Sequence, residues 1–201
     1  MGKIFAFMIL SVLVTTGYTT QCDTCWSIGS TKCCTKDEIT CEGSKCMTMS
    51  EYCSVGDLRL NTVKKTCGIE QLCGACLSIT TACNFQTRVS TECGSGNYSN
   101  ENLNFKKLCP DPLPPNNLKC PSCYKNGTTD VCESNEEVLC GGAETECLEY
   151  RGILELSNTL ILPLSLKACI TQGGCDNGFA AIPGAKEHQR VLMKCTPAIP
   201  V

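Results

Sequence analysis

Residues 120–123 read Cys-Pro-Ser-Cys, and residues 22–25, 98 positions earlier, read Cys-Asp-Thr-Cys. Each motif opens a series of cysteines, and the two series correspond to one another. The later blocks recur in register as well: 41–46 with 140–147, 67–73 with 169–175, and Cys93 with Cys195. Because several spacing blocks recur together, the sequence predicts two copies of one structural unit.

The cysteine content sets the compartment and the chemistry. The chain has 21 cysteines in 201 residues, and none precedes Cys22. This density is typical of a disulfide scaffold in an oxidising compartment, where small domains need covalent cross-links to supplement their cores. The three Cys-x-x-Cys motifs therefore predict disulfides rather than zinc or redox sites, since no βαβ pattern accompanies them.

The N-terminus resembles a signal peptide over residues 1–20. Lys3 supplies the positive charge, and the apolar run 4–14 is too short to span a bilayer. Small and polar residues follow, so cleavage falls between residues 17 and 20. After Cys195 there is no hydrophobic tail for a membrane or lipid anchor. We expect a secreted, extracellular protein.

The stretches between cysteines predict an all-β protein. Residues 148–167 read as a long apolar hairpin that turns at 157–159, and no long amphipathic helix is evident. The proline-rich segment 110–119 predicts a stiff linker, because proline fixes extended backbone. The expected domains are therefore residues 21–109 and 120–201.

Charge and motif content exclude several functions. The net charge is -3 and the sequence pI is about 5.3, which argues against a nucleic-acid partner. His188 is the only histidine, and no Gly-x-Ser-x-Gly elbow is present. We expect no catalytic, cofactor-binding or metal-binding residues, and hence a protein that is not an enzyme.

The cysteine order resembles that of the urokinase-receptor-like three-finger domain, in which hairpins project from a disulfide knot. Two such units, a signal peptide and a proline-rich joint ending in residues 116–123 (NNLKCPSC) resemble the gamma-type phospholipase A2 inhibitors. The resemblance covers essentially the whole mature chain. It implies two tandem three-finger domains and a binding function, although this fold carries many unrelated functions.

The resemblance also implies disulfide pairs that spacing alone leaves open. In the second unit these are Cys120–Cys147, Cys123–Cys132, Cys140–Cys169 and Cys175–Cys195. In the first unit they are Cys22–Cys46, Cys25 with Cys33 or Cys34, Cys41–Cys67 and Cys73–Cys93.

The first unit departs from the family pattern. The family has a further cysteine pair where this chain has Gly94 and Ser99, so both partners of one cross-link are missing together. Five cysteines lie outside the implied pairs: Cys53, Cys76, Cys83, Cys109 and one of Cys33 and Cys34. Because 21 is odd, at least one cysteine lacks an internal partner. It could stay free, bind a small thiol, or link two chains into a homo-oligomer.

Two kinds of surface site are expected. Asn97 and Asn126 each begin an Asn-x-Ser/Thr sequon in a polar segment and are candidate glycosylation sites. The apolar hairpin supplies candidate partner-binding residues, with a linker leucine as a second surface: Leu154, Leu156, Leu160, Leu162 and Leu113. The alternative is that the hairpin leucines pack inward and against the neighbouring domain.

These features favour a secreted phospholipase A2 inhibitor-like protein that acts by covering the enzyme, without chemistry of its own. The alternative is a secreted signalling ligand or reproductive pheromone of the two-domain three-finger type, which would bind a receptor. The rearranged cysteines of the first unit fit that alternative at least as well.

Overall fold

The computed structural model describes residues 19–33, 37–55, 57–82, 85–103, 105, 109–156 and 160–201. The segment 1–18, Cys34, Cys83 and the hairpin tip 157–159 lie outside the described residues. Strands dominate, and the predicted all-β, disulfide-rich fold is confirmed. Within the described ranges, no helix is long and apolar enough to cross a membrane.

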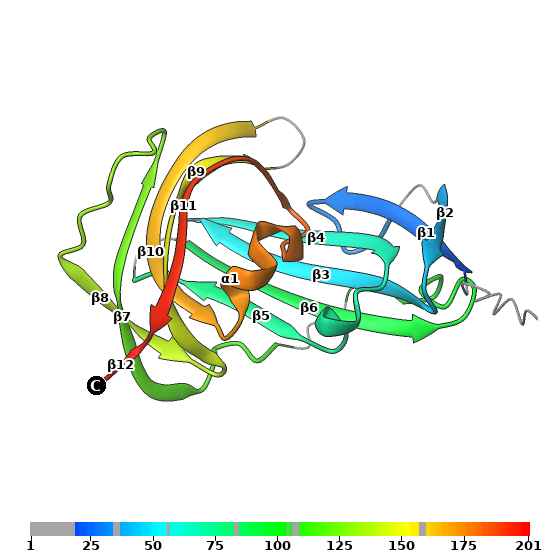
Figure 1. The fold of residues 1–201 in the computed structure, drawn as a ribbon, viewed down its shortest axis with the longest axis horizontal. Coiled ribbons are helices and arrows are strands. Elements are labelled where there is room, and N and C mark those ends of the chain that lie inside the picture. The colour runs from blue at the N-terminus through cyan, green and yellow to red at the C-terminus, as the bar shows by residue number, and fades with distance from the viewer. Residues whose placement is uncertain are drawn as a thin grey trace, which may run out of the picture.

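The first half contains three antiparallel hairpins (Figure 1). Their strands are β1 (Thr19–Ile28) with β2 (Asp37–Glu42), β3 (Lys45–Val55) with β4 (Leu58–Cys67), and β5 (Cys76–Thr80) with β6 (Phe85–Ser95). A short 3-10 turn, η1 (Glu70–Leu72), precedes β5. Strand β6 returns alongside β3, so the second and third fingers share one sheet.

The second half repeats this plan. Its strands are β7 (Pro115–Asn126), β8 (Glu136–Gly141), β9 (Glu144–Leu156), β10 (Leu160–Thr171), β11 (Ala185–Pro197) and β12 (Ile199–Pro200). Strand β11 pairs with β9 as β6 pairs with β3. The short helical turns α1 (Gly174–Asn177) and η2 (Gly178–Ala181) occupy the place of β5. Strand β7 begins inside the segment expected to be a linker.

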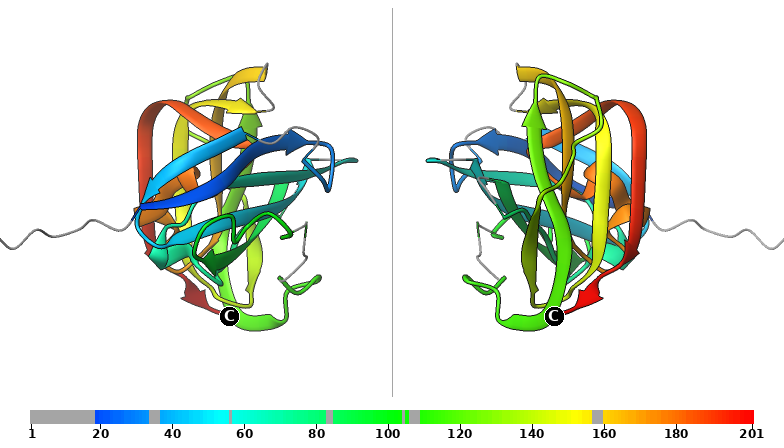
Figure 2. Two further views of the ribbon diagram at one scale, coloured as in Figure 1. Left: turned by 90° about the vertical axis from the view of Figure 1, so that its right-hand side faces the viewer. Right: turned by 90° about the vertical axis from the view of Figure 1, so that its left-hand side faces the viewer.

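The halves join edge to edge in one sheet. Its order is β11-β9-β10-β5-β6-β3-β4-β1-β2, with β7, β8 and β12 attached beside β10. The junction is the antiparallel pair β5–β10, where Ile79 lies opposite Ile170. The two views in Figure 2 show the second half curving around the end of the first-half strands.

The largest core lies between the halves. The first half contributes residues such as Met47, Met49 and Val89, and the second contributes Tyr150 and Leu166 among others. The aromatic rings of Phe85 and Tyr124 stack across this junction, with their centroids 5.5 Å apart. The two halves are therefore packed as one body around a shared apolar interior.

Candidate functional site

A pair of stacked disulfides holds the base of each half. In the first half, Cys22–Cys46 lies against Cys41–Cys67, with the Sγ atoms of Cys22 and Cys41 3.5 Å apart. In the second half, Cys120–Cys147 lies against Cys140–Cys169, with the corresponding sulfurs 3.6 Å apart. The same knot therefore closes both sets of fingers.

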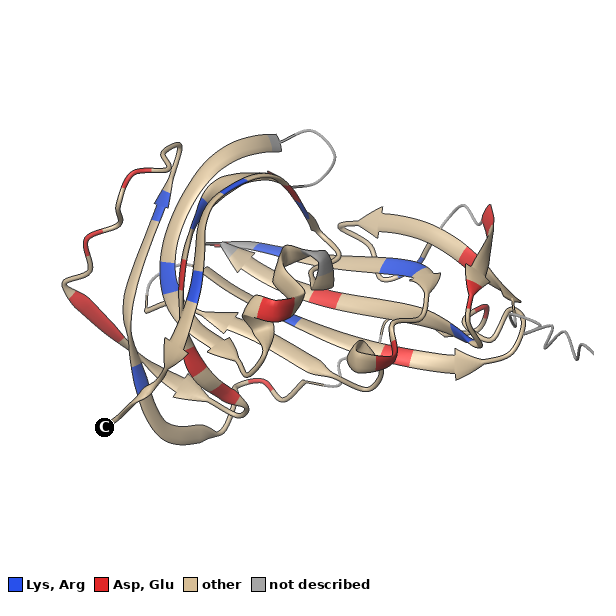
Figure 3. Cartoon of the chain, in the orientation of Figure 1, with Lys and Arg blue, Asp and Glu red and all other residues tan. Residues whose placement is uncertain are grey.

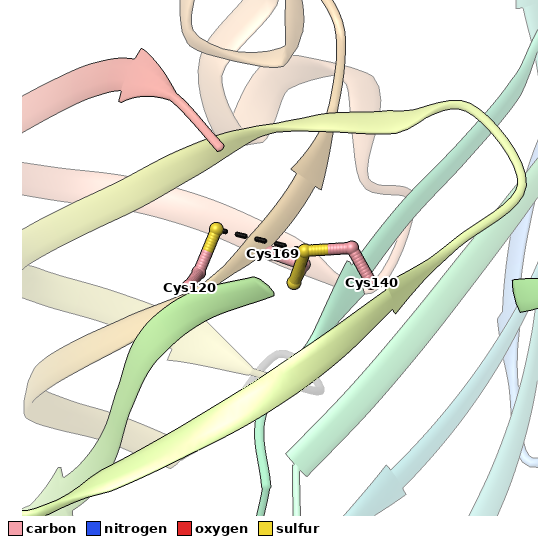
Figure 4. A group of neighbouring side chains, drawn as sticks. All are labelled: Cys120, Cys140 and Cys169. Atoms are coloured by element: carbon pink, nitrogen blue, oxygen red, sulfur yellow. Dashed lines mark hydrogen bonds between the residues drawn. A yellow bond between two sulfur atoms is a disulfide. The ribbon is translucent and has the colours of Figure 1, made fainter. Parts of the chain in front are cut away.

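The sulfurs of Cys120, Cys140 and Cys169 lie close enough together for a metal site (Figure 4). Each of these sulfurs is bonded to another sulfur: Cys140 to Cys169, and Cys120 to Cys147. Metals bind thiolates, and a disulfide has none to offer. The donor set does not fit a metal ion, and the cluster is a covalent anchor for the fingers.

The structure brings the remaining family partners together and adds one pair. These disulfides are Cys25–Cys33, Cys73–Cys93, Cys123–Cys132, Cys175–Cys195 and the additional Cys76–Cys109. Cys25 thus bonds to Cys33 rather than to its neighbour. The extra disulfide ties β5 to the segment that leads into the second half. Nothing in the cysteine spacing signalled this pair.

Cys53 is the free thiol among the cysteines that the structure describes. It lies on β3, packs against the shared core, and faces the Thr87 position of β6. Burial first, and then the nearby Glu51 carboxylate, raise the pKa of this thiol to about 12. A thiol with so high a pKa is a poor nucleophile and a poor partner for a second chain.

Glu51 is a buried carboxyl group at the junction of the halves, with 3% of its surface exposed. Its Oε2 accepts a hydrogen bond from the Gly184 amide at 2.7 Å, and its Oε1 accepts one from the Thr87 hydroxyl at 2.9 Å. Burial raises its pKa, while these hydrogen bonds act in the opposite direction. Glu51 connects β3 directly to the loop that enters β11.

The candidate partner-binding leucines fall in different environments. Leu154 is 1% exposed and belongs to the shared core, so its assignment to a partner surface is wrong. Leu162 is partly buried against the same core. The side chains of Leu156 and Leu160 lie outside the described residues. Alternate hairpin residues thus pack inward and cover the neighbouring half, as the alternative interpretation expected.

The two glycosylation candidates are exposed, whereas the linker leucine is partly buried. Asn126 and Asn97 are both exposed, and the Asn97 Oδ1 accepts a hydrogen bond from the Gln21 amide at 3.0 Å. Leu113 is partly buried, and its side chain packs over Gly141 and Gly142. The linker leucine therefore contacts the second-half knot region.

His188 lies on the surface of β11, where its Nε2 is 2.6 Å from Oε2 of Glu155. This hydrogen bond lowers the pKa of Glu155. The contact is a surface pair between neighbouring strands.

No family model matches the chain. The phospholipase A2 inhibitor NAI of Notechis ater is 26% identical over 201 residues, covering 96% of this chain and 94% of that protein. A gamma-type phospholipase A2 inhibitor chain of Laticauda semifasciata is 26% identical over 90% of this chain and 97% of its own length. Its counterpart from Elaphe climacophora is 29% identical over 77% of this chain and 76% of its own length.

The crystal structure of mouse TEX101 is similar at 19% identity and a TM-score of 0.37, covering 89% of this chain and 98% of that one. The sequence relatives carry the stronger likeness, because their identity to this chain is 26% over a similar coverage. This chain resembles the gamma-type phospholipase A2 inhibitors of snakes along nearly its whole length.

Proposed function

We propose that this chain is an extracellular binding protein that inhibits a secreted phospholipase A2. The observation that carries the proposal is the end-to-end similarity to proteins named as inhibitors of that enzyme, covering 96% of this chain and 94% of the Notechis protein. The similarity extends through both halves, so it includes the knots and the fingers that they anchor.

The inhibition acts by steric occlusion. The cysteines of the knots are held in disulfides, and the thiol of Cys53 is partly buried and has a raised pKa. These sulfurs supply no thiolate nucleophile. A rigid, disulfide-anchored set of fingers loses little conformational entropy on binding, which suits a protein that covers another protein's surface.

The secreted form begins after a signal peptide that is cleaved after residue 17. Thr20 supports this choice, because it is buried and its hydroxyl donates to the Gly43 carbonyl at 2.6 Å. Cleavage just before Gln21 would remove that contact. The disulfides that join the described cysteines fit the oxidising secretory route. The two repeated domains of the proposed protein are residues 21–109 and 120–201, and β7 begins in the joint between them.

The test is titration of the oxidised, purified protein against secreted phospholipases A2 from the source animal. Hydrolysis is measured on a monomeric short-chain substrate and on vesicles. If the protein occludes the enzyme, both reactions should be inhibited at the same molar ratio of protein to enzyme. If it only coated the lipid, it would inhibit the vesicle reaction alone. Reduced and alkylated protein is the control. Absence of inhibition across acidic and basic enzymes would rule out the proposal.

A second candidate function is a signalling ligand or pheromone. It is favoured by the rearranged cysteines of the first half, where Cys76–Cys109 is added and the pair at positions 94 and 99 is missing. Receptor capture from a courtship gland, together with no phospholipase inhibition, would support this function instead. Expression in liver and plasma would favour the inhibitor.

A further inference from the structure

The three-stranded unit β12–β7–β8 has two unlike faces. Residues Cys120, Val138 and Cys140 point inward and form a small buried cluster, with Leu118 and Ala198 packed against it. Because side chains alternate along a strand, the intervening residues point outward. The register places Ile199, Lys119 and Leu139 side by side in one row across that outward face.

This outward row is apolar and open. Leu139 is 69% exposed, Ile199 is 49% exposed, and Pro121 is also exposed. Between them lies the aliphatic stem of Lys119, whose ammonium group is paired with Glu137 at 2.9 Å. We call Lys119, Pro121, Leu139 and Ile199 the outer patch. Its centre is apolar, and its single cation is already neutralised.

The first half shows that the fold does not require an apolar patch here. The pair Cys22–Ile39 corresponds in register to Cys120–Val138, so Gln21 and Thr40 occupy the places of Lys119 and Leu139. There the Nε2 of Gln21 donates to the Thr40 hydroxyl at 2.9 Å. The same architecture thus forms with a polar, internally satisfied face. The fold therefore does not require leucine at position 139, because the first half forms the same structure with threonine at the equivalent position.

The edge of the first-half face is also covered differently. The amide of Tyr98 donates to the Gln21 carbonyl at 2.6 Å, and the Tyr98 hydroxyl donates to Glu38 at 3.1 Å. In the second half, Ile199 of β12 lies beside Lys119 and adds apolar surface instead. Two independent positions of the second half have therefore become apolar at the same face, which marks an interaction surface.

Acidic residues gather at the tip end of this finger. Glu137 lies on the outward face, where it pairs with Lys119, and Glu136, Asp130 and Glu133 are exposed at the start of β8 and on the segment leading into it. Near Pro121 the surface also holds Lys167 and Lys194. Figure 3 shows acidic positions along this finger, at the end of the molecule opposite β1 and β2. An apolar row beside an acidic finger tip complements a partner whose apolar contact has lysine and arginine on one side.

We propose that the outer patch is the docking surface for a basic protein partner, which binds by inserting apolar side chains against Leu139 and Ile199. The inference rests on the proposed function, and the partner is then a basic secreted phospholipase A2. The acidic finger tip speeds and orients the encounter, and the apolar row slows dissociation.

The test compares the wild type with Leu139→Thr/Ile199→Thr in binding to a basic secreted phospholipase A2, measured by surface plasmon resonance. Leu139→Thr copies the residue that the first half has at the equivalent position. The double variant is expected to raise Kd by about 30-fold or more, mainly through faster dissociation. The matched control is Val191→Thr, which changes a 48% exposed residue on β11 and leaves Kd within about twofold.

Equal binding by wild type and double variant would overturn the docking surface and leave the proposed function standing. Failure of the wild type to bind any phospholipase would remove the proposed function and this inference with it. A wild-type dimer in sedimentation that Leu139→Thr/Ile199→Thr converts to monomer would also overturn the proposal, because the occupant would be a second copy. Glu137→Lys reverses a charge on the outward face beside Leu139 and is expected to slow association, whereas an unchanged association rate would contradict the electrostatic part of the proposal.

Discussion

The central fingers of the two halves occupy equivalent places and differ in what they bring to the shared core. The two strands can be aligned from Cys46 on β3 and Cys147 on β9, and alternate residues after these cysteines point inward. On β3 the inward residues are, in order, Met47, Met49, Glu51 and Cys53, and on β9 they are Leu148, Tyr150, Gly152 and Leu154. The first half brings a carboxyl group and a thiol where the second brings glycine and leucine. The disulfide knot places the backbone of these strands equivalently in the two halves, whereas the side chains at the inward positions differ according to how the halves pack together.

This contrast gives a packing role to Cys53, the free thiol among the described cysteines. Cys53 stands where the other half has a core leucine, and it is partly buried against the shared core. A thiol in such surroundings behaves mainly as a small apolar side chain. Cys53 therefore contributes to the packing at the junction.

Removal of a knot disulfide gives the largest expected effect. The variant Cys140→Ala/Cys169→Ala lacks a cross-link of the second half and should lose about 2–5 kcal/mol of unfolding free energy. Because the halves share a core, the fluorescence of Trp26 in β1 should report the same loss. Urea unfolding followed by Trp26 emission and by circular dichroism makes the measurement.

The counterpart Cys41→Ala/Cys67→Ala is the matched variant, and it should shift both signals together in the same way. An unchanged Trp26 transition in the second-half variant would show that the halves unfold separately and would break the comparison.

Truncation of the equivalent core pair should give the next effect. Leu154→Ala removes a fully buried side chain and should cost about 3 kcal/mol, whereas Cys53→Ala removes one sulfur atom and should cost about 1 kcal/mol. Chemical denaturation of both variants measures the difference. Equal losses of unfolding free energy in the two variants would contradict the idea that Leu154 contributes more packing than Cys53 at these equivalent positions.

The missing cross-link of the first half can be restored. A Cβ built on Gly94 would lie 2.6 Å from the Cβ of Ser99, so a disulfide between these positions requires the two segments to move apart by about 1 Å. The variant Gly94→Cys/Ser99→Cys should form this bond and gain about 2 kcal/mol when oxidised. Thermal unfolding with and without reductant measures the gain.

Single Gly94→Ala serves as the control and should be destabilising, because the added methyl group meets Ser99 without forming a bond. If the double variant carries the disulfide by mass mapping and is no more stable, then the first half does not depend on the number of its cross-links.

Neutralising Glu51 should give the smallest effect, on the order of 1 kcal/mol. Its raised pKa means that the folded protein binds the proton more tightly than the unfolded chain. Wild-type stability should therefore fall as pH rises from the ordinary glutamate range through the raised folded value. The Glu51→Gln variant keeps an oxygen that can accept the hydrogen bond from the Gly184 amide, and its stability does not fall over this pH range. Its unfolding free energy therefore exceeds that of the wild type most at pH values above the raised pKa of Glu51.

Urea unfolding across pH 4–9 measures this difference, with exposed Glu133→Gln as the control. Parallel pH profiles of Glu51→Gln and the wild type would show that burial of the carboxyl group carries no cost.

The recurrence of the cysteine blocks predicted the repeat, and the hairpin-like stretches between the cysteines predicted the all-β class. The disulfide pairs came only with the family resemblance, because spacing leaves them open. None of these patterns placed Leu154. Alternation along a strand shows which residues share a face, but not what covers that face. The outer patch was equally hidden, since it depends on the β12–β7–β8 register and on comparison with Gln21 and Thr40.

The β5–β10 junction also has a consequence for biosynthesis. During translation the first half emerges long before Ile170, its partner opposite Ile79, has been made. Until then Met47, Met49 and Val89 lack the apolar surface that buries them in the finished protein. In the proposed secreted form, the nascent first half enters the secretory compartment with this face uncovered. Chaperones that bind exposed apolar surface are therefore expected on the half-made chain and absent from the complete one.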